Sequence, residues 1–126
     1  MININPELVC QIIDKARQFH AKEEVVIPEP PNSPADESIM QVLQDHGDDL
    51  TYQEVSLAIK DLEPDQQQEL VALMWLGRDD YTLEEWETAL QDAADRWNER
   101  TAEYLLATPL VADYLMEGLG LHGYSC

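Results

Sequence analysis

The sequence predicts an all-α protein: a single compact domain of about six helices with orthogonal or bundle-like packing. Three observations carry this prediction. Apolar residues recur every three to four positions, the spacing that gives a helix one apolar face. Helix-start signals precede these segments. No stretch of alternating β-branched residues indicates a strand, and 126 residues fit one domain, residues 1–126.

The first predicted helix begins with Asn5 as N-cap and Pro6 at its first position, where the missing N–H of proline costs nothing. Residues 23–35 hold four of the seven prolines and predict an extended connector, because proline fixes φ and removes a backbone donor. A strap along the core is favoured over a polyproline ligand for an aromatic groove. Residues 33–36 resemble a capping box that opens a second helix, which ends at Gly47.

Residues 51–54 form a capping box that predicts the start of a third helix. Pro64 begins a fourth helix, which is apolar around most of its circumference, ends at Gly77 and is therefore expected at the centre of the core. Residues 82–85 form another capping box and begin the longest predicted helix, of roughly six turns. The apolar period of this fifth helix runs through Trp86, Leu90, Ala93, Trp97, Thr101, Tyr104 and Leu105.

Thr108 and Pro109 are expected to stop the fifth helix and to cap a sixth. Residues 119–126 contain glycine and show no apolar period, which predicts a flexible tail. Trp75 lies within the apolar run of the fourth helix and is predicted to be a core residue.

The charge balance excludes several classes of partner. Twenty-six Asp and Glu against seven Lys and Arg give a formal net charge of -19. Nucleic-acid phosphates and anionic lipids require a cationic surface, so we expect no direct nucleic-acid binding and no membrane binding. No segment reaches the ~18 apolar residues of a membrane helix. A basic protein remains as a partner; a homo-oligomer is compatible with the sequence but is not indicated by it.

The two cysteines are expected to be reduced thiols. Cys10 and Cys126 lie 116 positions apart, and a bridge from a helix to a frayed terminus would be an unusual staple. Reduced thiols suit a reducing cytoplasm, and the N-terminus lacks the basic start and apolar run of a signal peptide. We therefore expect a cytoplasmic protein.

No pattern predicts a catalytic residue, a metal ligand or a cofactor site. A helix–loop–helix calcium site with Glu85 at position 12 would place Met74, Leu76 and Arg78 at positions 1, 3 and 5, where oxygen ligands are needed. The histidines lack the paired spacing of metal sites; they are His20, His46 and His122.

Arg78 is a speculative surface site together with Asp79 and Asp80. Arg78 is one of three cations after residue 60 and lies at a predicted turn beside Trp75. It could clamp a carboxylate or a phosphate. The favoured interpretation is structural: Arg78 neutralises the C-terminal end of the fourth helix and pairs with a nearby acid.

The second half of the chain carries a family resemblance. It rests on three stretches: residues 70–79 (LVALMWLGRD), residues 83–86 (LEEW) and residues 101–115, in which TAEYLLATPL is followed by ADYL. Together, from Leu70 to Leu115, they resemble a family of small acidic bacterial proteins known only as a domain of unknown function. The resemblance implies a bacterial, cytoplasmic, helical domain and no assigned reaction, cofactor or partner.

The sequence therefore favours a non-enzymatic interaction domain whose acidic surface meets a basic protein. Two alternatives stay open. One is an acidic mimic of nucleic acid that occupies another protein's binding site. The other is a small enzyme with a site near Arg78.

Overall fold

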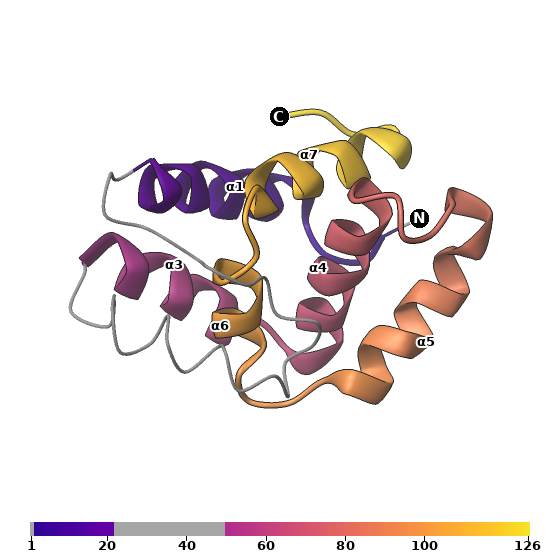
Figure 1. Ribbon diagram of the computed structural model, residues 1–126, viewed down its shortest axis with the longest axis horizontal. Coiled ribbons are helices and arrows are strands. Elements are labelled where there is room, and N and C mark those ends of the chain that lie inside the picture. Colours follow the sequence, from indigo (N-terminus) through magenta and orange to yellow (C-terminus); the bar gives the residue numbers. More distant parts are fainter. Residues whose placement is uncertain (1, 22–49) are drawn as a thin grey trace.

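The computed structural model describes residues 2–21 and 50–126 of the chain. These residues form six α-helices and one short 3-10 turn, and no strand occurs among them (Figure 1). The all-α prediction is confirmed. The elements are α1 (Pro6–His20), α3 (Leu50–Lys60), α4 (Pro64–Gly77), η1 (Leu83–Glu85), α5 (Trp86–Arg96), α6 (Thr101–Leu106) and α7 (Val111–Leu121).

Helix α4 is the centre of the packing, as its apolar circumference predicts. It packs against α7, α5 and α6, while α1 packs against α7 and α3 (Figure 1). Every residue of α4 from Glu69 to Leu76 is buried, including Trp75, which is 3% exposed. Burial of this kind removes apolar area from water and is the main favourable term in folding.

Two glycines let α4 and α7 approach closely. A Cβ at Gly77 would lie 1.8 Å from the backbone oxygen of Tyr114 on α7. A Cβ at Gly118 on α7 would lie 2.3 Å from the backbone oxygen of Leu73 on α4. Any side chain at either position would collide with backbone, so the crossing of the two helices depends on both glycines.

Several helix boundaries match the sequence. The side chain of Asn5 accepts a hydrogen bond from the Glu7 N–H at 2.9 Å and caps α1, with Pro6 at the first position. Pro64 begins α4. The predicted capping box at 82–85 is present, but it opens the 3-10 turn η1, which leads into α5.

Two predicted boundaries are wrong. Thr51 is not an N-cap, because Leu50 and Thr51 are both already helical. Thr108 does not cap the last helix. Its hydroxyl donates to the backbone oxygen of Tyr104 at 3.0 Å and closes α6, while Leu110, with a positive φ of 63°, stands at the N-cap position of α7.

The prediction of a single long fifth helix is also wrong, because the helix ends before Trp97 and the segment forms two helices, α5 and α6. Trp97 leaves the helix with φ -60° and ψ 138°, and its indole N–H donates to the buried Gln67 side chain at 2.8 Å. The next residues form their own turn. The Asn98 side chain accepts from the Arg100 N–H, and the Asn98 carbonyl accepts from the Thr101 hydroxyl, each at 2.8 Å. Trp86 and Trp97 therefore do not share a helix.

The last helix extends into the segment predicted to be a tail. Helix α7 continues through Leu121, although the predicted tail begins at residue 119. The reason is packing: Leu119 is fully buried in the core and also accepts the Tyr124 backbone N–H at 3.0 Å.

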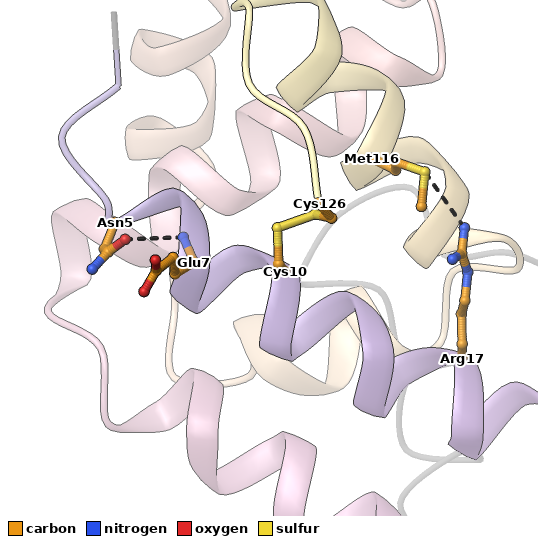
Figure 2. The surroundings of a disulfide bond; sticks show 6 residues. All are labelled: Asn5, Glu7, Cys10, Arg17, Met116 and Cys126. Atoms are coloured by element: carbon orange, nitrogen blue, oxygen red, sulfur yellow. Dashed lines mark hydrogen bonds between the residues drawn. A yellow bond between two sulfur atoms is a disulfide. The ribbon is translucent and has the colours of Figure 1, made fainter.

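The expectation of two reduced thiols is wrong. Cys10 on α1 and Cys126 form a disulfide, with their Cα atoms 5.6 Å apart (Figure 2). Packing explains the error. Because α7 lies along α1, the chain that leaves α7 returns to α1 and closes a separation that is large only in sequence.

The predicted connector at 23–35 and the second helix up to Gly47 lie outside the described residues. Six helices were predicted and six α-helices are described, but the sets differ, because the predicted fifth helix is two helices.

Candidate functional site

The turn after α4 brings together the residues singled out as a speculative site. Helix α4 ends at Gly77, and Asp79 takes a left-handed backbone conformation with φ 72°, which redirects the chain toward η1. Aspartate tolerates this region better than most residues because its short side chain bonds locally. The turn places Arg78 and Asp80 side by side.

Arg78 is held on two sides. Its Nε donates to Asp80 Oδ2 at 2.8 Å and its Nη2 lies 2.7 Å from the same oxygen. On its inner side it meets the buried hydroxyl of Tyr104. Burial lowers the pKa of Arg78, but the interactions with Asp80 and Tyr104 together raise it by more. The net pKa is therefore above its ordinary value, and the guanidinium stays charged. The ion pair with a neighbouring acid, expected from the sequence, is present.

Aromatic residues complete this cluster. The Trp75 indole N–H donates to the Tyr104 hydroxyl at 2.9 Å, and the Arg96 guanidinium lies 5.6 Å from the centre of the Trp75 ring. Tyr81 packs on Trp75 and donates to the Asp92 carboxylate. That hydrogen bond, followed by burial, raises the pKa of Tyr81 to about 12.

We name this group the arginine cluster. Its members are Trp75, Arg78, Asp80, Tyr81, Asp92, Arg96 and Tyr104. Asp79, the third residue of the speculative site, is exposed and belongs to it only through the backbone turn. Both guanidinium groups are already engaged, Arg78 by a carboxylate and Arg96 by an aromatic face, so an anion would have to displace Asp80 to bind.

A second site, which the sequence does not indicate, lies between α4 and α5. It is a cleft of about 310 Å³. We name it the acidic cleft; its described lining residues are Asn3, Asp65, Gln68, Glu69, Glu87 and Leu90. Asp65, Gln68 and Glu69 come from α4, Glu87 and Leu90 come from α5, and Asn3 comes from the segment before α1. In Figure 1, α5 lies to the right of α4, against which it packs.

Glu69 is the most buried acid of the cleft, at 4% exposed. Its carboxylate accepts the backbone N–H of Asn3 at 2.8 Å and of Ile4 at 3.1 Å, which fixes the chain before α1 against α4. Burial raises the pKa of Glu69, and the two backbone hydrogen bonds lower it by less, so its net pKa is raised. Glu69 is therefore a structural acid that also adds negative charge to the cleft.

No cationic side chain compensates the cleft within the described residues. The ion pairs described for the chain are Lys15–Glu54, Arg17–Asp113, Lys60–Glu103 and Arg78–Asp80, and none includes a residue that lines the cleft. Asp65 and Glu87 are both exposed. The cleft thus presents two exposed carboxylates, those of Asp65 and Glu87, that can receive an ammonium or guanidinium group.

Gln67 and Glu69 are buried polar residues that sequence reasoning missed. Gln67 donates to the carbonyls of Ile59 at 3.0 Å and Leu62 at 3.2 Å and accepts from Trp97. The available signal was position: both residues begin the run that continues as the most apolar part of α4. A polar side chain there must find partners inside the protein.

The part of the chain that the structure describes holds no group of three His, Cys, Asp or Glu residues arranged for a metal ion. Among the same residues, no helix has both the length and the apolar character needed to cross a bilayer.

Comparison with protein-family models identifies a family for most of the second half of the chain. Residues 52–124 match the family described as protein of unknown function, DUF3775, and this range is more than half of the chain. The chain belongs to the DUF3775 family. The resemblance from Leu70 to Leu115 lies inside the matched range. Searches of curated proteins and of solved structures find no match.

The DUF3775 match covers the whole arginine cluster but only part of the acidic cleft. The whole arginine cluster lies within residues 52–124, as do five residues of the acidic cleft. Asn3, which completes the cleft and binds Glu69, lies outside the matched range, and so do both cysteines of the disulfide.

Proposed function

We propose that this DUF3775 protein is a non-enzymatic interaction domain that binds a basic protein partner through the acidic cleft. The observation that carries the proposal is the imbalance of charge at the cleft. Asp65, Glu69 and Glu87 line it together, and no cationic side chain of the described residues pairs with them.

The cleft suits a lysine or arginine side chain. Two unit charges 4 Å apart attract by about 1 kcal/mol in water and by about 4 kcal/mol at an effective dielectric constant of 20, so a partly enclosed carboxylate binds a cation better than an exposed one. Glu69 forms the buried floor, with its backbone hydrogen bonds already made, while Asp65 and Glu87 stand exposed at the rim. An incoming cation would contact Asp65 and Glu87 first.

Electrostatic steering would make this association fast and sensitive to salt. An acidic surface raises the encounter rate with a basic partner, and salt reduces the effect because the screening length shrinks to about 10 Å at 0.1 M. The affinity for the partner should therefore fall as salt rises.

A bacterial origin and a cytoplasmic location are part of the proposal. The disulfide is the observation that counts against the cytoplasm, because stable disulfides are rare in reducing compartments. The acidic mimic of nucleic acid stays a prediction: it would bind a nucleic-acid-binding protein, and DNA would compete with it. The small enzyme near Arg78 is the weaker alternative, because Asp80 already occupies that guanidinium.

The test compares two double variants that carry the same net charge. In the cleft variant, Asp65→Asn and Glu87→Gln remove one carboxylate from α4 and one from α5. In the control variant, Asp14→Asn and Glu117→Gln remove one exposed carboxylate each from α1 and α7, neither of which is in an ion pair of the described residues. Each protein is titrated with a fluorescent oligolysine peptide at low and at 0.5 M NaCl.

We expect the cleft variant to bind at least about tenfold more weakly than the control variant at low salt, a loss of about 1.4 kcal/mol. All binding should weaken at high salt. Equal loss in both variants would show that only net charge matters and would overturn the cleft as the binding site. Partners captured by the parent and lost by the cleft variant are then tested with a competing DNA duplex, which should displace them only if the domain is a mimic.

A further inference from the structure

The disulfide joins helix α1 to the segment that follows α7, and these two parts differ in how many other contacts attach them to the protein. Cys10 lies in α1 and is half-buried, while Cys126 is exposed at the end of the segment that follows α7. In Figure 2 this segment descends from α7 and meets α1 at the sulfur–sulfur bond. The bond therefore joins a half-buried residue to one at the protein surface.

Helix α1 does not need the bond to stay in place. Val9, Ile12, Ile13, Ala16 and Phe19 bury its inner face. Arg17 pairs with Asp113 of α7 at 2.9 Å and also donates to the sulfur of Met116. These contacts fix α1 against α7 whether or not the bond is closed.

The last residues of the chain do depend on it. Gly123 N–H donates to the Gly120 carbonyl at 3.0 Å, and Tyr124 N–H donates to Leu119. Beyond Tyr124, the described residues give Ser125 no hydrogen bond, and the disulfide is the link that attaches Cys126 to the rest of the molecule. Opening the bond would free residues 125–126 and leave the buried contacts of α1 and α7 intact.

We propose that the Cys10–Cys126 disulfide is a redox latch: a dithiol reductant of the thioredoxin class opens it in the folded protein and releases the segment after Tyr124 from α1. A thiolate of the reductant attacks the sulfur of Cys126, the more exposed of the two residues, and Cys10 leaves as a thiolate that takes up a proton. The second thiol of the reductant then attacks the mixed disulfide and releases Cys126 as a thiol. The latch gains two electrons and two protons, and the reductant becomes a disulfide.

The latch is independent of the acidic cleft, since neither cysteine lines it. It would give the protein two states in a reducing compartment: a closed state after oxidation, and an open state that presents an exposed thiol near the C-terminal end of α7. The bond also closes a loop across almost the whole chain, so the closed state should be the more stable one, because the unfolded chain loses entropy.

The test follows the bond in the full chain without denaturant. The oxidised protein is treated with thioredoxin and its recycling system, alkylated with N-ethylmaleimide and weighed as the intact chain, while far-UV circular dichroism reports helix content. We expect both cysteines to be alkylated, an unchanged helical signal at 25 °C, and a Tm lower by more than about 10 °C. Cys10→Ser, which cannot form the bond, should have the same low Tm, and the reductant should not change it.

Three results would overturn the latch. Alkylation that requires urea would show a structural bond that reductants cannot reach in the folded state. Loss of the helical signal on reduction, or in Cys10→Ser, would show that the bond holds the fold and not only the segment after Tyr124. Two free thiols in protein exposed to an oxidised glutathione buffer would show that the bond does not form.

Discussion

The arginine cluster and the acidic cleft both lie beside α4, but the charged side chains are paired in the cluster and, among the described residues, have no cationic partner in the cleft. At the arginine cluster, Arg78 binds Asp80, Asp92 accepts from Tyr81, and Arg96 lies over Trp75. At the acidic cleft, the exposed carboxylates of Asp65 and Glu87 meet no cationic side chain of the described residues.

The difference shows why an unusual residue is a poor guide to a binding site. Arg78 stands out in an acidic sequence because cations are rare after residue 60. In the fold, however, Arg78 is already paired with Asp80. Asp65 and Glu87 are ordinary acids in a sequence that has twenty-six of them, and they become distinctive only when α4 and α5 bring them to one cleft.

Trp75→Ala should have the largest effect of the changes considered. Trp75 is 3% exposed and donates to Tyr104, and truncating a buried tryptophan costs about 3–5 kcal/mol. We expect the variant to unfold or to lose that much stability in urea denaturation. Tyr104→Phe, which removes the hydroxyl that accepts the indole N–H and meets Arg78, should cost about 1–3 kcal/mol. Parent-like unfolding of both would mean that the cluster does not organise this end of α4.

The pH dependence of stability should identify Glu69 as the buried acid of the cleft. Its pKa is raised in the folded protein above the ordinary value of 4.5, so the folded state holds its proton more tightly than the unfolded chain. Its contribution is therefore complete below pH 4.5 and is lost as pH rises through the raised pKa.

Glu69→Gln has no such titration. Between pH 7 and pH 5 the parent should gain free energy of unfolding relative to Glu69→Gln, as measured by paired urea titrations. An opposite slope would place the pKa of Glu69 below its ordinary value, and the hydrogen bonds from Asn3 and Ile4 would then outweigh burial.

Salt should stabilise the protein through the uncompensated acids. A net charge of -19 is self-repulsive, and the screening length falls from ~30 Å at 0.01 M to ~10 Å at 0.1 M salt. The parent Tm should rise over this range. The rise should be smaller in the cleft variant than in the control variant of equal charge. A flat parent Tm would mean that the acids are already compensated locally.

Calcium and zinc should have the smallest effect. The turn at 74–85 lacks oxygen ligands at the required positions, and the described residues contain no group of three ligands for a metal. Titration calorimetry should show only weak, diffuse binding. A single stoichiometric calcium site of micromolar affinity would contradict this and would favour ion sensing over protein binding.

The sequence predicts what depends on neighbours in the chain. Asn5 caps α1, Pro64 begins α4, and the box at 82–85 forms, because each signal acts within about four residues. The central place of α4 follows from its composition, because a helix that is apolar around most of its circumference is buried.

What the sequence does not predict depends on partners distant in the chain. The apolar period continues through Trp97, but a hydrogen bond to Gln67, thirty residues earlier, favours leaving the helix. Cys10 meets Cys126 only because α1 and α7 pack together. The acidic cleft is formed by residues from α4, α5 and the segment before α1, so no single stretch of the sequence predicts it.

The most direct test of the account is a ¹H–¹⁵N titration of the labelled protein with oligolysine at low salt. The account predicts that backbone amide shifts concentrate within residues 65–69 and 87–90, the stretches of α4 and α5 that contain the lining residues of the acidic cleft, and that the amides of 78–81 move little. Shifts centred on 78–81, or spread evenly over all exposed acids, would contradict it.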